Sequence, residues 1–137
     1  MEIVIPRTSD HAGLRLFKPK WSPSGELDCF TVEIDGPGIH ATAPVYAFGA
    51  ERLPDLFQGM ARECRGWAGA LEWKSVEGEF ELACTSDGLG HVSIEVSLRT
   101  SLPGGWQVHA TAEIDAGQLD ALADAAQRFF QSNKTSP

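Results

Sequence analysis

The strongest constraint on this fold is an alternation of apolar and polar residues that fills the second half of the chain. It is divided by glycine-containing turns into four strand-length segments, which are 70–76, 79–85, 91–99 and 106–114. Successive side chains of a β-strand point to opposite faces, so each segment has one apolar and one polar face. Tight turns join strands that pair antiparallel. The pattern predicts an antiparallel meander with one buried face, and it places Trp73, Phe80 and Trp106 in the core.

The first half of the chain reads as further strands followed by a helix. The strand segments, ended by prolines and glycines, are 3–5, 14–17, 28–34 and 39–48. A helical stripe then follows at spacings of three and four, formed by Leu53, Leu56, Phe57, Met60, Ala61 and Cys64. Pro54 is tolerated in the first turn of this helix, and Gly66 is a natural stop after it.

A second helix closes the chain. Asp115 is a favourable N-cap, and Gln118, three residues later, completes a capping box. The apolar stripe of this helix consists of Leu119, Leu122, Ala123, Ala126, Phe129 and Phe130. The order of elements predicts an α+β fold, an antiparallel meander sheet with two helices packed on one face. We expect a single domain over residues 1–137, with an ordered core at about 3–131 and a frayed tail at 132–137.

Cysteine use and the ends of the chain bear on location and cofactors. Cys29, Cys64 and Cys84 are odd in number and widely separated, so we expect small core residues in a reducing cytoplasm. They offer no zinc-ligand spacing, and no motif for another metal or cofactor is present. The chain has no apolar run long enough to cross a membrane, and its start lacks the features of a signal peptide. We expect a cytoplasmic protein without a cofactor.

The net charge of −8 is concentrated in one part of the chain. Residues 66–127 hold ten acidic and only two basic residues, while the remainder is balanced. Such a surface repels phosphate, which argues against binding nucleic acid or an anionic membrane, and it attracts a basic partner. The alternative is that the charge only keeps the protein soluble.

The polar face of the meander is where this charge gathers. The two-residue turn at 77–78 places Lys74 opposite Glu81 and Glu72 opposite Ala83. In two of three registers of the next hairpin, Glu81 or Glu79 lies opposite Glu95, which costs folding free energy; the third register relieves the clash. We predict a partner-binding surface whose residues are Glu72, Glu79, Glu81, Glu95 and Glu113, with Trp21 as a further anchor. The alternative for the carboxylates is an ordinary solvated face, and for Trp21 a core contact.

No arrangement of residues in the sequence indicates catalysis. His91 and His109 both point outward, but in the most natural register His109 faces Ser97, about 20 Å along the strand from His91 at about 3.4 Å per residue. Motifs for a serine nucleophile, a zinc hydrolase or a phosphate-binding loop are absent. We therefore expect no catalytic residues and a protein that is not an enzyme.

Several spaced residues resemble a known family. They are Gly66-Trp67-x-Gly69, Trp73, Ser75-x-Glu77-Gly78, Asp87-x-x-Gly90-His91-Val92, Trp106 and Ile114-Asp115. Over roughly residues 14–130 the chain resembles a family of small, uncharacterised actinobacterial proteins similar to the WapI-type immunity proteins of polymorphic toxin systems. The resemblance implies a cytoplasmic protein that binds and neutralises a toxin domain. It carries over no catalytic residue and does not identify the binding surface.

Two functions therefore compete at this point. The first is an immunity-type protein that neutralises a basic toxin domain by occlusion, through its acidic sheet face. The second is a small, non-catalytic ligand-binding or regulatory domain. Neither the residue pattern nor the resemblance specifies the toxin, a ligand or the oligomeric state.

Overall fold

The computed structural model describes residues 1–47, 52–100 and 104–131. Each half of this part of the chain runs through four strands and then a helix. In chain order the elements are β1 (Glu2–Ile5), β2 (Gly13–Trp21), β3 (Leu27–Gly36), β4 (Ile39–Tyr46), α1 (Leu53–Arg62), β5 (Leu71–Lys74), β6 (Phe80–Ser86), β7 (His91–Arg99), β8 (Gln107–Asp115), a 3₁₀ turn (Ala116–Gln118) and α2 (Leu119–Phe129). The predicted tail at 132–137 and the end of the predicted strand at Phe48 lie outside the described residues.

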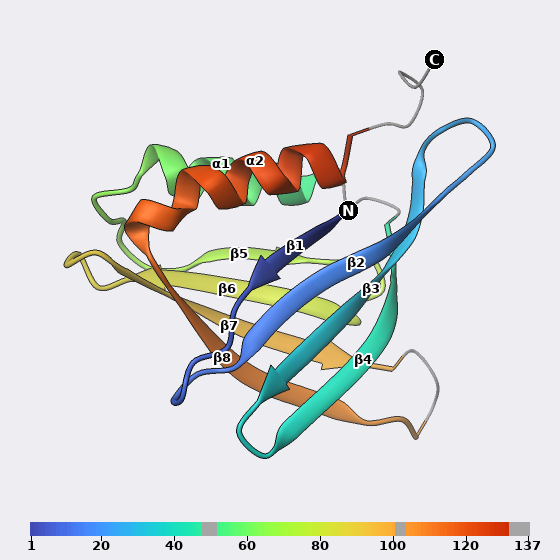
Figure 1. Ribbon diagram of the computed structural model, residues 1–137, viewed down its shortest axis with the longest axis horizontal. Coiled ribbons are helices and arrows are strands. Elements are labelled where there is room, and N and C mark those ends of the chain that lie inside the picture. The colour runs from blue at the N-terminus through green and yellow to red at the C-terminus, as the bar shows by residue number, and fades with distance from the viewer. Residues whose placement is uncertain (48–51, 101–103, 132–137) are drawn as a thin grey trace.

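The strands form two antiparallel sheets of four strands each, ordered β1-β2-β3-β4 and β5-β6-β7-β8. The α+β class and the meander are confirmed, whereas the prediction of one sheet is wrong. Each sheet has its own apolar face, and the two faces bury each other together with the helices (Figure 1). Placement of both helices on one face of the meander stays a prediction. The loop before β2 also joins the sheets, since Ala12 N–H donates to the carbonyl of Thr111 in β8 at 3.0 Å.

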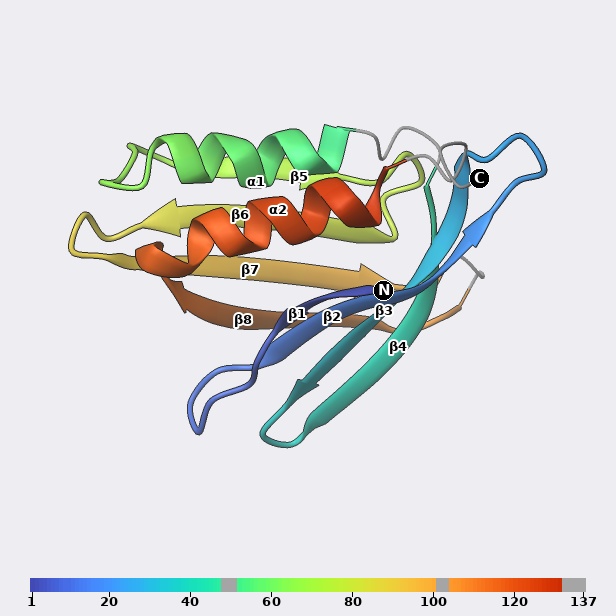
Figure 2. The ribbon, with the colours of Figure 1, turned by 45° about the horizontal axis from the view of Figure 1, so that its top comes forward.

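The two helices lie side by side (Figures 1 and 2). A polar contact joins them, in which Gln58 Nε2 of α1 donates to Gln127 Oε1 of α2 at 2.7 Å. At the entry to α2, Gln118 Oε1 accepts a hydrogen bond from Asp115 N–H at 2.9 Å, as the capping box requires. Helix α1 ends at Arg62, so Cys64 lies beyond it and is exposed. The prediction of Cys64 as a core residue is therefore wrong.

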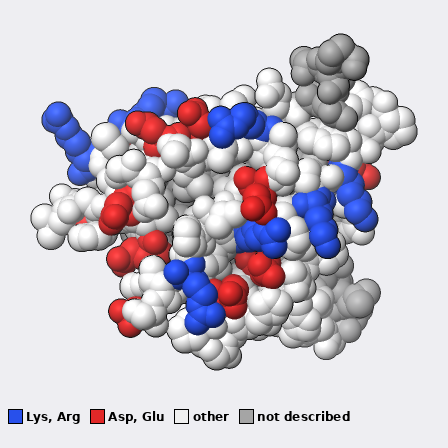
Figure 3. Space-filling model, viewed as in Figure 1, with Lys and Arg blue, Asp and Glu red and all other residues white. Residues whose placement is uncertain are grey.

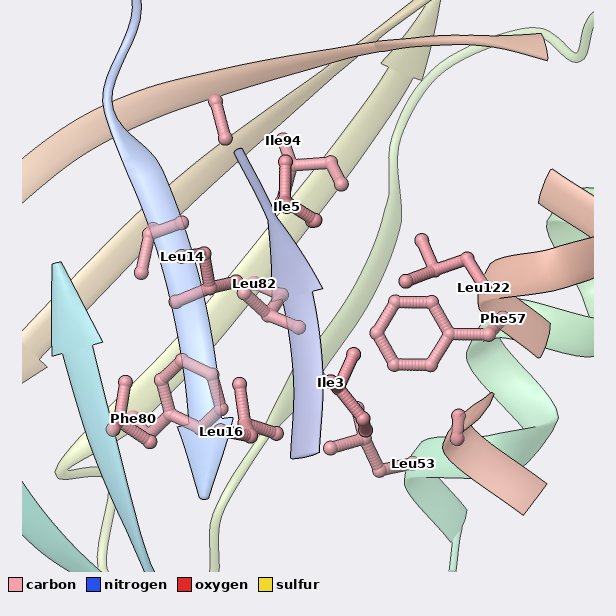
Figure 4. Close-up of a cluster of buried hydrophobic side chains, with 14 of the residues drawn as sticks. Ile3, Ile5, Leu14, Leu16, Leu53, Phe57, Phe80, Leu82, Ile94 and Leu122 are labelled. Atoms are coloured by element: carbon pink, nitrogen blue, oxygen red, sulfur yellow. The ribbon is translucent and has the colours of Figure 1, made fainter. Parts of the chain in front are cut away.

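The core is continuous across both sheets and both helices. Figure 4 shows Ile3 of β1 and Leu82 of β6 in the same cluster as Phe57 of α1 and Leu122 of α2. An aromatic group extends this core. The Phe30 ring of β3 meets Phe80, Phe129 and Phe130 edge to face, with ring centroids 6.4, 5.7 and 5.5 Å away. Phe30 thus contacts the second sheet and the end of α2 at once.

The predicted burial of the aromatic residues is confirmed only in part. Phe80 is fully buried and packs edge to face on Trp73, which is itself half-buried. Trp106 is 41% exposed, so its assignment to the core is wrong. The inner positions of β8 explain this difference. Ala112 and Ile114 are buried, whereas Val108 is only half-buried, because the opposing layer covers β8 mainly toward its C-terminal end.

No helix in the described ranges is both long and apolar enough to span a bilayer.

The position of Phe30 gives a test of the fold. Replacement by alanine (Phe30→Ala) removes the edge-to-face contacts and leaves a cavity where the layers meet, so we expect the free energy of unfolding to fall by about 3–5 kcal/mol. Urea unfolding followed by circular dichroism measures this change. Tyr46→Ala is the control, because Tyr46 is 52% exposed and its loss should cost about 0.5 kcal/mol or less. Equal losses in the two variants would contradict the central role of Phe30.

Candidate functional site

The candidate site lies on the outer face of the β5–β8 sheet, and the strand register defines it. Lys74 pairs with Glu81 and Glu72 with Ala83, as the turn at 77–78 predicts. Continued across the sheet, the register sets two outward rows, which are Lys74–Glu81–Ser97–His109 and Glu72–Ala83–Glu95–Thr111. The register places no two carboxylates directly opposite each other between β6 and β7.

The two clashing registers considered above are therefore wrong, and the third is the observed one. It pairs Phe80 with Leu98 and Leu82 with Val96, so every large inward side chain of β6 keeps an apolar partner. Cross-strand repulsion between Glu81 and Glu95 is accordingly not an argument for function. Their function must be judged from their surroundings in the structure.

Those surroundings form a hollow of about 830 Å³ on the outer face of this sheet. Its lining comes from β5, β6, β7 and β8, and its volume lies within the range of small-molecule pockets. Short side chains at Ala83, Ser97 and Thr111 leave space between longer ones. The longer side chains that line it are Glu72, Lys74, Glu81, Glu95 and His109.

Several charged side chains on the outer face of the first sheet are paired with one another. Arg15 Nε lies 2.7 Å from Glu2 Oε2, and Glu33 Oε2 lies 3.0 Å from His40 Nε2. Arg7 reaches Asp35 at 3.5 Å. Figure 3 shows basic and acidic side chains interleaved over the side of the molecule where this sheet lies in front. These pairs reduce the charge that this face offers to a partner.

The charged side chains that line the hollow are not paired in this way in the described structure. Among the described residues, Glu72, Lys74, Glu81 and Glu95 make neither an ion pair nor a side-chain hydrogen bond. Three carboxylates and one ammonium group therefore remain available to a ligand or a partner. The unpaired charges and the hollow occupy the same face.

Three of the predicted partner-binding residues, Glu72, Glu81 and Glu95, line the hollow. Glu113 lies outside it, with its Oε2 3.5 Å from His11 Nε2 of the loop before β2. Trp21 is half-buried at the end of β2, where it pairs with Leu27, and so belongs to the other sheet. The structure does not bring Trp21 to the acidic face.

The prediction of Glu79 on the solvent face is wrong. Its side chain is 2% exposed, and the Ser75 hydroxyl donates a hydrogen bond to its Oε1. Ser75 Oγ in turn accepts a hydrogen bond from Phe80 N–H at 3.1 Å. Glu79 follows Gly78, whose φ of +73° closes the turn, and precedes the first paired residue of β6; strict alternation does not extend into such a turn. Glu79 is thus a buried turn residue that a partner cannot reach.

The sequence analysis did not assign the other outward residues that line the hollow to the binding surface, although it placed several of them on the same face. They are Ala83, Ser97, Thr111, His109 and Lys74. The signal that could have found them was the outward phase of the alternation, combined with a choice of register. Without that choice, the outward residues could not be arranged into rows. The small residues at the centre therefore gave no indication of a hollow.

The histidines do not form an acid–base pair. His109 pairs with Ser97, as predicted, while His91 pairs with Asp115 at the other end of the same two strands. Six residues separate Ser97 from His91, which corresponds to about 20 Å at about 3.4 Å per residue. One substrate could not reach both imidazoles.

His91 instead forms a local pair with Asp87 in the turn before β7. His91 Nδ1 lies 2.9 Å from Asp87 Oδ2. Asp87 Oδ1 accepts hydrogen bonds from the N–H groups of Leu89 and His91, and these lower the pKa of Asp87. The hydrogen bond to Asp87 and its charge raise the pKa of His91. Both side chains are well exposed, so the pair orders the turn and is not a buried catalytic centre.

Two further groups of residues bear on the chemistry of the protein, the potential metal ligands and the cysteines. In the ranges 1–47, 52–100 and 104–131, no three His, Cys, Asp or Glu side chains converge as metal ligands would. Burial raises the pKa of the Cys84 thiol to about 12, so this cysteine is a neutral core residue, as predicted. Cys29 is half-buried.

Comparison with known proteins adds a family but no activity. Residues 5–133 match the model of a "Family of unknown function (DUF6228)". No curated protein shows significant sequence similarity to the chain.

The Asp87–His91 pair gives a prediction about pH. Because the folded pKa of His91 is raised above 6.5, the pair contributes stability below about pH 6.5 and loses it as the pH rises through the raised value. In Asp87→Asn the pKa of His91 should fall toward 6.5, measured by NMR titration of the imidazole Cε1 proton. Asp120→Asn, on the exposed side of α2, is the control and should leave this titration unchanged. An unaltered His91 pKa in Asp87→Asn would show that the pair does not form in solution.

Proposed function

We propose that this chain, which belongs to the DUF6228 family of unknown function, is a binding protein whose acidic β5–β8 face docks a basic protein partner. The observation that carries the proposal is the set of unpaired charges, Glu72, Glu81 and Glu95, around one hollow. Several charges on the first sheet form ion pairs with one another, whereas these carboxylates make no ion pair among the described residues. A positively charged surface would supply the countercharge.

The site is held by a rigid support, as a docking face requires. Its residues project from four hydrogen-bonded strands, and the inner face of the same strands belongs to the core. We place both helices on that inner face, which leaves the outer face free for a partner. Since the carboxylates need no rearrangement of the backbone to bind, little conformational entropy is lost on docking.

The partner class that we favour is a basic toxin domain, in line with the resemblance to WapI-type immunity proteins. In this function the chain binds the toxin domain in the cytoplasm and covers the surface through which the toxin acts. It performs no chemistry itself. Occlusion requires only tight and rapid association. Long-range attraction between an acidic face and a basic one accelerates such association.

A second candidate function is binding of a small cationic ligand. The hollow of about 830 Å³ favours it, because this volume suits a small molecule. The two functions differ in what they require of the surrounding surface. A small ligand would contact only the lining, whereas a protein partner would also bury residues around it.

The carboxylates of the hollow give the test of the proposed function. The double variant Glu81→Gln/Glu95→Gln should fold normally but associate more slowly with a toxin domain encoded beside this gene, by about fivefold or more at low salt. The difference should shrink in 1 M salt, where the Debye length falls from about 10 Å at 0.1 M to about 3 Å. Stopped-flow or biolayer interferometry measures the association rate constant.

The matched control is Asp120→Asn/Asp124→Asn, two exposed carboxylates on α2 that change the net charge equally. This control variant should associate with the toxin domain nearly as fast as the wild type. If both double variants slow association equally, only net charge matters and the face has no special role. If neither variant changes the rate at either salt concentration, the carboxylates form a solvated face.

A further inference from the structure

We propose that the hollow receives one arginine side chain of the partner, with its guanidinium group over Ala83. This inference rests on the proposed function and deepens it, because it names the chemical group at the centre of the interface. It concerns the middle of the hollow, where Ala83 and its neighbouring carboxylates lie.

Ala83 is surrounded by carboxylates. Glu72 lies directly opposite it on β5, and Glu95 lies directly opposite it on β7. Directly opposed residues of antiparallel strands have Cβ atoms about 4.5–5.5 Å apart. Glu81 is two residues away on the same strand, a distance of about 7 Å. A cationic group above the Ala83 methyl is therefore within reach of three acidic side chains.

The space above Ala83 is not filled by the protein itself. Ala83 has the shortest side chain in the row Glu72–Ala83–Glu95–Thr111. Ser97 and Thr111, on the neighbouring strands, are also short. The outward positions nearest to Glu95 are Ala83, Thr111, Ser93 and Ser97, and none of them is cationic. The described structure thus supplies no countercharge to Glu95, and the hollow leaves room for an external one.

The arrangement suits arginine better than lysine. Glu72 and Glu95 stand on opposite sides of Ala83, two strand spacings apart, which is about 10 Å between their Cα atoms. A guanidinium group is planar, has five N–H donors and is weakly hydrated, so one group can donate to two carboxylates at once. An ammonium group is a compact, strongly hydrated point charge, so it bridges two separated carboxylates less well than a guanidinium group does. Lys74 lies directly opposite Glu81 and offsets part of its charge, so Glu72 and Glu95 supply most of the attraction for the guanidinium group.

A protein-borne arginine is the occupant to which we commit. Arginine is among the residues that dominate binding energy at protein interfaces, where it is inserted into a pocket and shielded by surrounding contacts. The hollow supplies such a pocket within a broad sheet face. A free guanidinium compound would lack the surrounding contacts and should bind much more weakly.

The test uses the full chain and synthetic probes. An acetylated peptide with three arginines alternating with glycine is titrated into ¹⁵N-labelled protein at low salt, and the dissociation constant is obtained by NMR. Matched peptides carry lysine or the neutral isostere citrulline, and arginine amide serves as the free compound. We expect the arginine peptide to bind about tenfold more tightly than the lysine peptide, with the largest shifts at Ala83 and Glu95.

Two substitutions of Ala83 test whether the empty space above this residue is needed for binding. Ala83→Leu fills the hollow without changing a charge and should weaken binding of the arginine peptide about tenfold. Ala83→Ser keeps the side chain small and is the matched control, so its affinity should stay close to that of the wild type. Thermal unfolding of each variant verifies the fold; leucine is tolerated at an outward strand position.

The outcomes separate this inference from the proposed function. Equal binding of arginine and lysine peptides, both weakened by Glu81→Gln/Glu95→Gln but unaffected by Ala83→Leu, overturns the arginine pocket and leaves the docking face intact. If the arginine peptide binds no more strongly than the citrulline peptide, both the arginine pocket and the acidic docking face are contradicted. Arginine amide binding as tightly as the arginine peptide overturns the protein-borne occupant and favours the small-ligand function.

Discussion

The edge-to-face contacts of Phe30 connect every layer of this protein. Its ring, on β3 of the first sheet, meets Phe80 of the second sheet and Phe129 and Phe130 at the end of α2. Neither sheet could bury its apolar face alone, because a two-layer domain needs an opposing surface. The aromatic group forms part of that surface, within a core that is continuous between the two sheets and the helices.

The packing assigns a different role to each sheet face. The inner face of each sheet is buried in the core, so of the two faces of a sheet only the outer one is open to a partner. On the first sheet, ion pairs such as Arg15–Glu2 and Arg7–Asp35 neutralise several of the outer charges. On the second, Glu72 and Glu95 flank Ala83 without a cation between them. The contrast between two sheets of equal size distinguishes a docking face from a merely polar one.

The pairing of Lys74 with Glu81, predicted from Glu77-Gly78, is confirmed. The two-residue turn itself is wrong, because β5 ends at Lys74, β6 begins at Phe80, and Gly78 N–H donates to the carbonyl of Ser75. One residue after Gly78, Glu79 turns inward to Ser75, because alternation holds only where neighbouring strands impose it. The predicted burial of Trp106 is wrong for a related reason. Its phase along β8 is apolar, but the opposing layer does not extend far enough to cover it.

By itself, the sequence determined the identity of the strands and helices, the antiparallel meander of residues 70–114 and the excess of acidic residues along it. These are local properties, set by side-chain period, turn residues and capping, and they need no knowledge of distant neighbours. Only the tertiary structure decided that there are two sheets, which of three registers joins β6 to β7, and that Glu72, Glu81 and Glu95 surround a hollow at Ala83. Layer packing depends on contacts between segments far apart in the chain. Registers that differ by two residues keep the same side chains on the inner face, so the alternation alone does not distinguish them.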